Sequence, residues 1–403
     1  MIINQLMSVK RSAYLYLTIF LLNTVPVVAQ ISPATRLNDV RSFEVSACSP
    51  SKNKLISVWM EKRPERKDDN PDAQDMRVAY KFSSDNGKSW TNKGIVDSPD
   101  TFGTGNPFVT ADERGDAYLV CMHIGNDFYS GNISLYQFDY KTKDFKLKSV
   151  PFKSDSQLLD KPAIVSFGNE IHLVYVAYNK KGPNAVKYQM SADDGKTWSI
   201  PVNVFPEVNT SFLGPSITRV NGKGVIVSSG AYGRGDVIIA TRKVGVDSIA
   251  FNKPVAVCKL SGSVGAAMTE ISSFDDKLII TWQPPHQRGE TWMSFSTNKG
   301  ETWAAPYMIC KKGNLLSSVF DKEGNIHAIY TDFGNNKFVV KYNQMNQQYE
   351  ELKQAILGQE TRSVTFKEYL GAYQKLLTRG NEFFAFWIDY ANDHTLYFSK
   401  WKE

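Results

Sequence analysis

The most informative octapeptide of this chain is Ser83-Ser84-Asp85-Asn86-Gly87-Lys88-Ser89-Trp90, which follows the pattern S-x-[DN]-x-G-x-[ST]-W. Two further copies run over 191–198 and 296–303, the last with Asn298 in place of the aspartate. The pattern suits a hairpin turn, because the carboxylate can accept hydrogen bonds from backbone N–H groups and the glycine can adopt a positive φ. We call these segments the signature turns. We expect their tryptophans to pack between neighbouring units and the turns themselves to be structural.

The signature turns belong to a longer unit that recurs about every 50 residues, a period typical of propeller blades. Each unit carries an apolar strand, a turn rich in glycine, aspartate and asparagine, and a second strand rich in aromatic and β-branched residues. The expected second strands lie at 54–59, 117–122, 171–176, 224–229, 278–282, 326–330 and 383–387. Short strands at even spacing predict an all-β propeller of six to seven four-stranded blades, with seven favoured.

The two ends of the chain complement each other. The last unit stops after its third strand, at 396–401, and the segment 33–37 supplies a spare strand near the N-terminus. We predict that this spare strand completes the last blade and closes the ring, since closure removes an exposed sheet edge. Residues 30–403 are then a single propeller domain.

The first 29 residues are typical of an export signal. Lys10 and Arg11 precede the apolar run 13–22, and Val27-Val28-Ala29 offers small residues for cleavage. The run is too short for a membrane span. We expect a mature protein that is periplasmic or extracellular, has no membrane span and is a monomer.

Composition excludes several classes of function. The net charge of +6 is spread along the chain, whereas nucleic-acid binding needs a dense basic face.

The chain has four cysteines whose spacing is neither that of a zinc site nor that of a redox pair. They are Cys48, Cys121, Cys258 and Cys310. For Cys258 and Cys310, both a disulfide and free thiols stay open. We expect no cofactor, because no phosphate loop, H-E-x-x-H motif or EF-hand loop occurs.

The signature turns resemble the Asp-box, or BNR repeat, of the sialidase superfamily. This resemblance implies a carbohydrate-handling propeller whose working face lies opposite the turns. The candidate residues on that face are Arg41, Glu44, the loop 61–75, His123, Asp127, Asp160, Arg234, Glu270, His286, Arg288, Arg362, Glu368 and Tyr369.

The same resemblance implies roles for some of these residues. Planar arginines would bind the carboxylate of a sialic acid, and sialidases use a tyrosine nucleophile with a glutamate base. The implied set is Arg41, Arg288 and Arg362 as carboxylate clamp, Asp69 as acid/base, Glu270 as helper base and Tyr369 as nucleophile.

Other residues match the sialidase pattern less completely. Arg63 ends a segment similar to the sialidase E-x-R motif. Tyr373 is an alternative nucleophile, and Asp68, Asp72 and Asp75 are alternative acids. The chain departs from sialidases in lacking the Ile-Pro half of their F-R-I-P motif and in its seven units, since sialidases have six blades.

Three functions are compatible with these residues. The first is a sialidase-like glycoside hydrolase that removes a terminal acidic sugar from glycans. The second is a polysaccharide lyase or other glycosidase acting on uronate-containing glycans. Its candidate residues are His123, His286, Arg234 and Arg288, because arginine can neutralise a uronate and histidine can transfer protons. The third is a non-catalytic glycan-binding propeller. Converging arginines beside a Tyr–Glu contact would favour the first, a pocket centred on a histidine the second, and a shallow face the third.

Overall fold

The structure is a computed structural model in which most of the chain is described. The described ranges are 31–63, 76–98, 101–127, 129–206, 208, 211–220, 224–231, 236–241, 249–259, 267–283, 289–334, 338–358, 373–389 and 394–403. The expected signal segment 1–29 lies outside them. Among the residues searched, the chain has no helix with the length and apolarity to cross a membrane.

Twenty-seven strands make up the regular structure of the described residues. The first thirteen are β1 (Thr35–Arg36), β2 (Ser42–Ser51), β3 (Lys54–Lys62), β4 (Met76–Ser83), β5 (Gly94–Val96), β6 (Gly103–Ala111), β7 (Ala117–Ile124), β8 (Gly131–Asp139), β9 (Asp144–Ser154), β10 (Gln157–Phe167), β11 (Glu170–Asn179), β12 (Ala185–Ser191) and β13 (Val202–Asn203). The others are β14 (Phe212–Val220), β15 (Gly224–Ala231), β16 (Asp236–Thr241), β17 (Val255–Lys259), β18 (Ala267–Phe274), β19 (Lys277–Gln283), β20 (Gly289–Ser296), β21 (Tyr307–Phe320), β22 (Ile326–Asp332), β23 (Val339–Met345), β24 (Glu351–Ile356), β25 (Gln374–Arg379), β26 (Glu382–Asp389) and β27 (Thr395–Lys402). All seven second strands expected from the sequence are present, as β3, β7, β11, β15, β19, β22 and β26.

The strands form five four-stranded sheets and one seven-stranded sheet within the described ranges. Four sheets follow chain order, as β2 to β5, β6 to β9, β10 to β13 and β14 to β17. The seven-stranded sheet runs from β18 to β24. Its central strand β21 is 14 residues long and pairs through its first half with β20 and through its second half with β22. This sheet therefore consists of two four-stranded units that share one strand.

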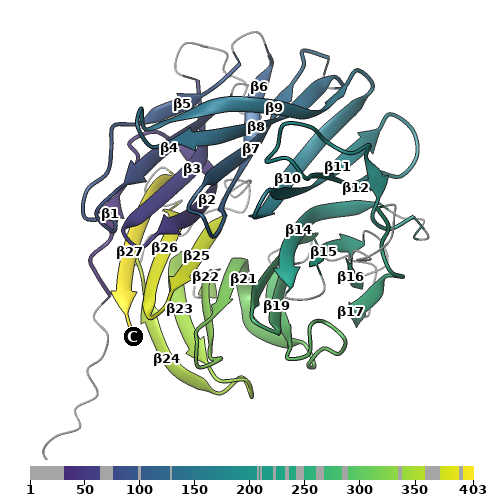
Figure 1. The fold of residues 1–403 in the computed structure, drawn as a ribbon. Coiled ribbons are helices and arrows are strands. Elements are labelled where there is room, and N and C mark those ends of the chain that lie inside the picture. The colour runs from purple at the N-terminus through teal and green to yellow at the C-terminus, as the bar shows by residue number, and fades with distance from the viewer. Residues whose placement is uncertain are drawn as a thin grey trace, which may run out of the picture.

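The sheets are arranged radially around the middle of the molecule, as in a β-propeller (Figure 1). We call β2, β6, β10, β14, β18, the second half of β21, and β25 the first strands of their units. Each first strand contacts the next along the chain, and β25 contacts β2. Serine hydroxyls link neighbouring first strands at equivalent places, because Ser46, Ser216 and Ser317 accept hydrogen bonds from backbone N–H groups of Val109, Ile271 and Leu376, at 3.2, 3.2 and 3.1 Å.

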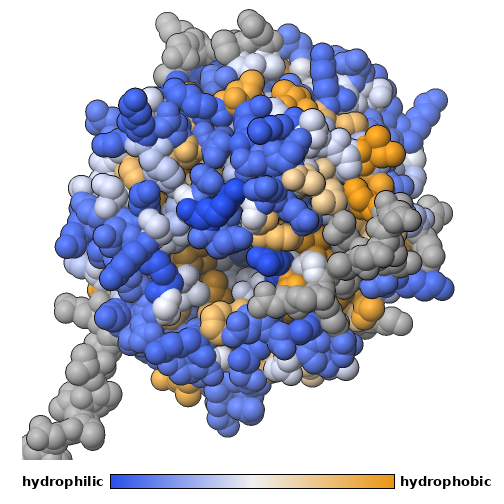
Figure 2. Space-filling view, viewed as in Figure 1, coloured by the Kyte–Doolittle hydropathy of each residue, from blue (hydrophilic) through white to orange (hydrophobic). Residues whose placement is uncertain are grey.

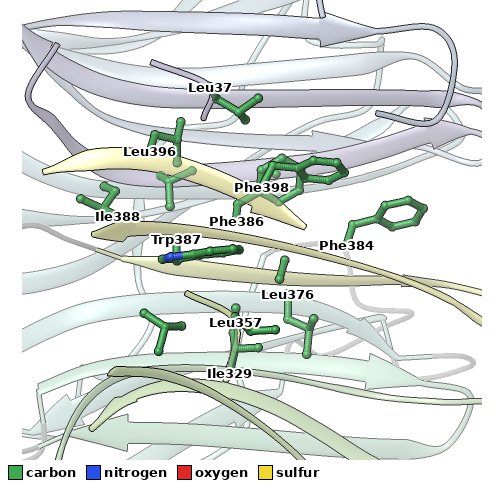
Figure 3. Packing of buried hydrophobic residues seen from close by; sticks show 14 of the residues in the cluster. Leu37, Ile329, Leu357, Leu376, Phe384, Phe386, Trp387, Ile388, Leu396 and Phe398 are labelled. Carbon is green, nitrogen blue, oxygen red and sulfur yellow. The ribbon is translucent and has the colours of Figure 1, made fainter. Parts of the chain in front are cut away.

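The N-terminal strand completes the last sheet, as the sequence predicts. The order of that sheet is β1-β27-β26-β25, and Thr35 lies opposite Phe398 in antiparallel register. Leu37 is buried in a cluster with Phe386, Trp387 and Phe398, which continues into residues of β2, β3, β22 and β23 (Figure 3). One apolar core thus joins the beginning of the chain, its end and the two neighbouring units.

The signature turns have the local geometry expected from their sequence. In the second copy, Asp193 Oδ1 accepts a hydrogen bond from the backbone N–H of Thr197 at 2.8 Å, and Gly195 has a φ of 82°. The serine that opens each copy accepts a hydrogen bond from the glycine N–H, at 2.8 to 2.9 Å. The tryptophans are partly buried, and Trp90 contacts the rings of Phe386 and Phe398 in the last sheet.

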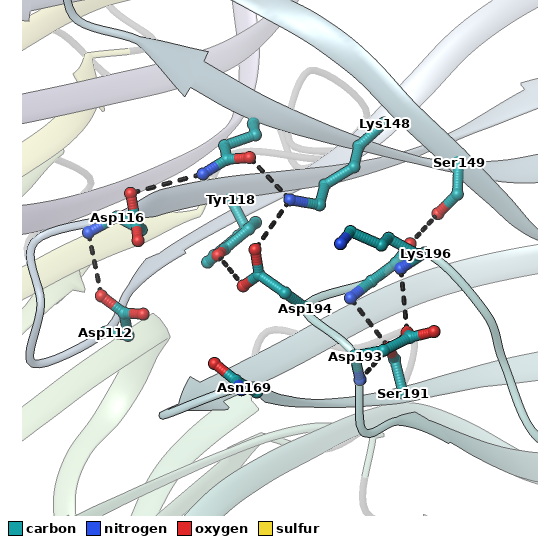
Figure 4. A network of polar contacts seen from close by, with 12 residues as sticks. Asp112, Asp116, Tyr118, Lys148, Ser149, Asn169, Ser191, Asp193, Asp194 and Lys196 are labelled. Atoms are coloured by element: carbon teal, nitrogen blue, oxygen red, sulfur yellow. Dashed lines mark hydrogen bonds and ion pairs between the residues drawn. The ribbon is translucent and has the colours of Figure 1, made fainter.

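The second signature turn also binds the preceding unit through its side chains. Asp194 accepts hydrogen bonds from the hydroxyl of Tyr118 at 2.5 Å and from Lys148 at 3.0 Å, both from the sheet β6 to β9 (Figure 4). Arg114 adds a third contact, at 2.9 Å. The turn therefore connects neighbouring sheets, which is a structural role.

Two histidines occupy equivalent places in the interior of their units. His172 and His327 are buried and lie 2.5 and 2.8 Å from the hydroxyls of Tyr188 and Tyr342, so both have a packing role. The indoles of the equivalent residues Trp59, Trp282 and Trp387 are also buried. All four cysteines are free thiols, and Cys258 and Cys310 are not bridged.

Candidate active site

A β-bulge recurs at one place in six of the first strands. The register shifts fall between Phe43/Ser46, Gly105/Phe108, Asp160/Ala163, Leu213/Ser216, Ala267/Glu270 and Asn314/Ser317. In five of them the first bulge residue has a positive φ, between 48° and 52°. These residues are Glu44, Asn106, Lys161, Gly214 and Met268. A bulge redirects a side chain away from the regular alternation of a strand, so the repeat can direct unlike side chains to a common point.

All five bulge residues line one pocket, which we call the central pocket. Its lining also includes Glu270, Tyr373, Gln374 and Lys375, and the apolar side chains of Phe108 and Trp282. The pocket encloses about 880 Å³ of empty space, counting its open mouth. Figure 2 shows hydrophilic side chains gathered around the middle of the molecule beside smaller hydrophobic areas.

The central pocket and the signature turns lie at opposite ends of the sheets. In the first sheet Phe43, next to Glu44, pairs with Met60, which pairs with Val78 near the start of β4. The signature turn begins at Ser83, at the other end of β4. No signature-turn residue lines the pocket. This is the separation that the sequence predicted for a working face.

Lys161 is the centre of a polar network on one side of the pocket. Its ammonium group lies 2.5 Å from Glu44 Oε1 and 2.5 Å from Asn106 Oδ1. The Asn106 amide in turn donates to Asp160 Oδ1 at 2.6 Å. The same ammonium group lies 4.9 Å from the centre of the Tyr373 ring. Side chains from β2, β6, β10 and the residue before β25 therefore meet in this network.

A second charged pair lies in the same pocket. Glu270 on β18 forms an ion pair with Lys375 on β25 and accepts a hydrogen bond from the Ser317 hydroxyl at 3.3 Å. The hydroxyl of Tyr373 lies 3.8 Å from Met268 Sδ, on the same strand as Glu270. The pocket thus holds two carboxylates, each with its own lysine, and one tyrosine.

Burial perturbs the titration of the first network. It raises the pKa of the Glu44 carboxyl group, although the Lys161 ammonium acts in the opposite direction. Burial also raises the pKa of the Tyr373 phenol, again opposed by Lys161. For Lys161 itself, burial lowers the pKa, but Glu44, Tyr373 and Asp160 together outweigh this effect, so that the pKa of Lys161 lies well above the ordinary value. Strongly perturbed titratable groups in one cleft are typical of functional sites.

The structure brings some of the sequence-predicted residues to the pocket and not others. Glu270 lines it, as do Tyr373, the alternative nucleophile, and Glu44 from the predicted face. Arg41 does not; its Nε lies 3.0 Å from His394 Nδ1. Arg63 is buried in an ion pair with Asp97 at 2.5 Å and also donates to backbone carbonyls, so it holds a loop in place.

His123 is buried away from the pocket lining. Its Nδ1 lies 2.8 Å from the Thr104 hydroxyl and its Nε2 3.0 Å from the Tyr136 hydroxyl. Burial lowers its pKa to about 4, with Asp97 acting in the opposite direction. Asp127 is described and does not line the pocket. The remaining candidates lie outside the described part of the chain; they are Asp68, Asp69, Asp72, Asp75, Arg234, His286, Arg288, Arg362, Glu368 and Tyr369.

Sequence reasoning assigned no role to Lys161 or Asn106, although the sequence held a usable signal. Proline follows the bulge residue in three first strands, at Pro107, Pro162 and Pro215. Proline inside a sheet is confined to edges and bulges, so a recurring X-Pro at the same place in successive units indicates a bulge. The residue before each proline would then have been a candidate for the pocket.

Comparison with known proteins supports the fold alone. No protein-family model and no curated protein matches the chain. A crystal structure of a protein of unknown function from Dyadobacter fermentans matches with a TM-score of 0.55 at 10% identity, over 93% of this chain and 99% of that one.

Two enzymes of known activity are more distant. The α-L-arabinanase of Penicillium chrysogenum, solved with arabinobiose, gives a TM-score of 0.49 at 13% identity over 93% of this chain and 97% of that one. The NanB sialidase of Streptococcus pneumoniae gives 0.47 at 11% identity, over 92% and 70%. Similarity at this level says nothing about activity.

Proposed function

We propose that the protein is a glycoside hydrolase whose active site is the central pocket. The observation that carries this proposal is the meeting of Glu44 and Glu270 in one pocket, each beside a lysine, with Tyr373 next to Glu44. Most glycosidases act through two carboxyl groups on either side of the scissile bond, and a tyrosine nucleophile with a glutamate base is the known variant. The pocket contains the groups for either scheme.

In the proposed mechanism the two carboxyl groups have different tasks. Glu44 is buried and its pKa is raised, which suits a group that must hold a proton and deliver it to the leaving oxygen. Glu270 is the anionic partner that acts on the opposite side of the sugar. Lys161 fixes the Glu44 carboxyl group, and Tyr373 lies where it can orient the substrate or, in the sialidase scheme, attack it.

The narrower proposal is membership of the sialidase superfamily, with export and release of a terminal acidic sugar. The three signature turns and the radial four-stranded sheets support the superfamily. In this proposal the shared strand β21 belongs to two blades, which makes seven, and the contact of β25 with β2 closes the ring. An arginine clamp would now have to come from Arg234, Arg288 or Arg362, because Arg41 and Arg63 are engaged elsewhere.

The test is turnover by the purified mature protein on chromogenic glycosides, including a sialoside and uronides. Glu44→Gln, Glu270→Gln and Tyr373→Phe should each lower kcat by roughly 100-fold or more, as expected for proton-transfer groups. Glu323→Gln is the matched control, because Glu323 forms an exposed pair with Lys322 outside the pocket. Full activity in both carboxylate variants would reject the site, and absence of turnover on every glycoside would reject the hydrolase.

A further inference from the structure

A second pocket lies between the sheet β10 to β13 and the start of β14, and we call it the outer pocket. It encloses about 860 Å³ of empty space, counting its open mouth. Glu44, Glu270 and Tyr373 do not line it, so the proposed catalytic residues leave it without a role. The polar side chains of its lining are four amides and one lysine; they are Gln157, Asn179, Asn184, Lys187 and Asn203.

The outer pocket adjoins the central pocket along two strands. On β10, Gln157 lines the outer pocket and Lys161 the central pocket. On β14, Phe212 lines the outer pocket and Gly214 the central pocket. Two residues of a strand span about 7 Å, so Phe212 and Gly214 place the two pockets next to each other. The outer pocket is therefore within reach of a chain molecule that is bound in the central pocket.

Polar side chains also connect the two pockets. Asp160 accepts a hydrogen bond from Asn106 of the central pocket at 2.6 Å. Tyr178 interacts with Asp160 and with Asn184 of the outer pocket, and burial raises the pKa of its phenol to about 12. Tyr178 therefore keeps its proton at neutral pH and stands between the two pockets.

Internal hydrogen bonds hold the outer pocket in shape. The Asn184 amide donates to the carbonyl of Phe212 at 2.8 Å, and the Phe212 N–H donates to Asn184 Oδ1 at 2.5 Å. The buried rings of Phe205 and Phe212 stack with their centres 5.1 Å apart. Gln157 donates to Asn179 Oδ1 at 2.6 Å. A lining that is fixed in this way loses little conformational entropy when a ligand binds.

The accessible amides of the outer pocket suit the hydroxyl groups of a sugar. Asn179 and Asn203 are exposed, and Gln157 is partly exposed. A side-chain amide has two N–H donors and an oxygen with two lone pairs, so the bond between Gln157 and Asn179 leaves both side chains with further capacity. Sugar hydroxyls both donate and accept hydrogen bonds, and a few fixed polar groups above apolar side chains are typical of small-molecule sites.

We propose that the outer pocket binds a further sugar unit of the glycan that occupies the central pocket, so that the preferred substrate is an oligosaccharide. This inference rests on the proposed glycosidase function and defines the length of its substrate. Contacts with a remote sugar unit supply binding energy that can be used at the reacting bond, and they raise kcat/KM for the longer substrate.

The experiment compares single sugars with the same sugars in a chain. Calorimetric titrations of the purified mature protein pair arabinose with arabinobiose, galacturonic acid with digalacturonic acid, and N-acetylneuraminic acid with sialyllactose. Nitrophenyl glycosides of the single and joined sugars report turnover. In at least one series the joined sugar should bind roughly 10-fold or more tightly than the single sugar. Equal affinities within every series, or no binding in any of them, would overturn the inference.

Variants show whether the outer pocket causes this gain in affinity. Gln157→Ala should reduce the ratio of the two affinities roughly 5- to 10-fold, the usual effect of losing one hydrogen bond to a ligand. Ala185→Trp should abolish the gain, because Ala185 lines the outer pocket and an indole there would fill it. Thermal unfolding checks that both variants are folded. An unchanged ratio in both folded variants would overturn the inference.

Two matched controls carry the same substitutions at exposed positions outside both pockets. They are Gln348→Ala and Ile200→Trp, and both should leave the ratio unchanged. Turnover that is independent of chain length would overturn the inference and leave the hydrolase proposal intact. A gain in affinity that Gln157→Ala and Ala185→Trp remove, without turnover on any glycoside, would support the outer pocket and reject the hydrolase.

Discussion

At the scale of single residues, several residues that line the central pocket have backbone conformations that are unfavourable for any residue except glycine. Glu44, Asn106, Lys161 and Met268 all have positive φ values without being glycine, and such conformations cost of order 1–3 kcal/mol each. The surrounding sheets impose them, since each lies in a bulge at the same register of its strand. Unfavourable backbone conformations that recur in one place are expected at functional sites.

Residue identity explains why the sequence located only part of the site. Glu270 was found because its segment resembles one in sialidases, and Tyr373 remained open beside Tyr369. Lys161 was missed, because a lysine in a strand is usually a solvated surface residue. Only the bulge and the contact with Glu44 reveal its place in the central pocket, and both depend on pairing between different strands.

His123 should make the protein sensitive to acid. Its pKa falls from 6.5 to about 4 in the folded state because the ring is buried, whereas the unfolded chain takes up a proton near 6.5. The stabilising effect is therefore present above pH 6.5 and is lost as the pH falls towards 4, by about 2 kcal/mol at pH 4.5.

Urea unfolding at pH 7.5 and 4.5 measures this effect. His123→Gln, which keeps a polar side chain that does not titrate, should lose about 2 kcal/mol less stability between the two pH values than the wild type. If both proteins lost the same free energy of unfolding between these pH values, His123 would take up a proton in the folded state as readily as in the unfolded chain.

At the scale of elements, the hairpin turns were easier to predict than the strands they join. The signature turn depends on a local pattern of acceptor, glycine and tryptophan, and all three copies adopt the expected hydrogen bonds. The bulges depend on pairing with a neighbouring strand and leave only the X-Pro pattern in the sequence. The shared strand β21 was also not foreseen, because its two halves belong to different units of the repeat.

The first signature turn should be sensitive to the smallest possible substitution. A Cβ atom on Gly87 would lie 2.5 Å from Cζ of Phe398 in the last sheet, and Gly87 has a φ of +77°. Gly87→Ala should therefore destabilise the protein by roughly 2–4 kcal/mol, through both backbone strain and overpacking. Thermal or urea unfolding measures the loss.

Gly168→Ala is the matched control for this prediction. Gly168 also has a positive φ, of +56°, but a Cβ there would have nothing within 4 Å, so only the backbone cost of about 1 kcal/mol remains. The difference between the two variants measures the contact between the first unit and the last. Equal losses would mean that the turn and β27 do not pack as the structure has them.

At the scale of the whole molecule, the order of the sheets follows directly from the repeat. A period of one four-stranded unit, repeated along the chain, places equivalent residues at equivalent distances from the middle. The sequence could therefore predict the sheets, the end at which the signature turns lie and the pairing of the N-terminal strand. It could not predict which residues meet at the centre, because that depends on side chains contributed by several units at once.

The N-terminal strand should stabilise the whole molecule rather than the last sheet alone. A chain that begins at Asn38 keeps the hydrogen bond from the Asn38 amide to the buried carboxylate of Glu61, at 3.2 Å, but loses β1 and Leu37. It should be less stable than a chain that begins at Ile31 by roughly 2–4 kcal/mol, since one buried leucine and its strand pairing are removed. Chemical unfolding and light scattering on both chains measure this difference.

The truncated chain should also associate, because the edge of β27 would be left unpaired. A synthetic peptide covering 31–37 supplies the missing strand in trans, and its addition should raise the unfolding midpoint and reduce the scattering. A scrambled peptide of the same composition is the control, since it retains the apolar residues without the register that sets Thr35 opposite Phe398. If the short chain melted like the longer one and stayed monodisperse, the last sheet would hold together without β1.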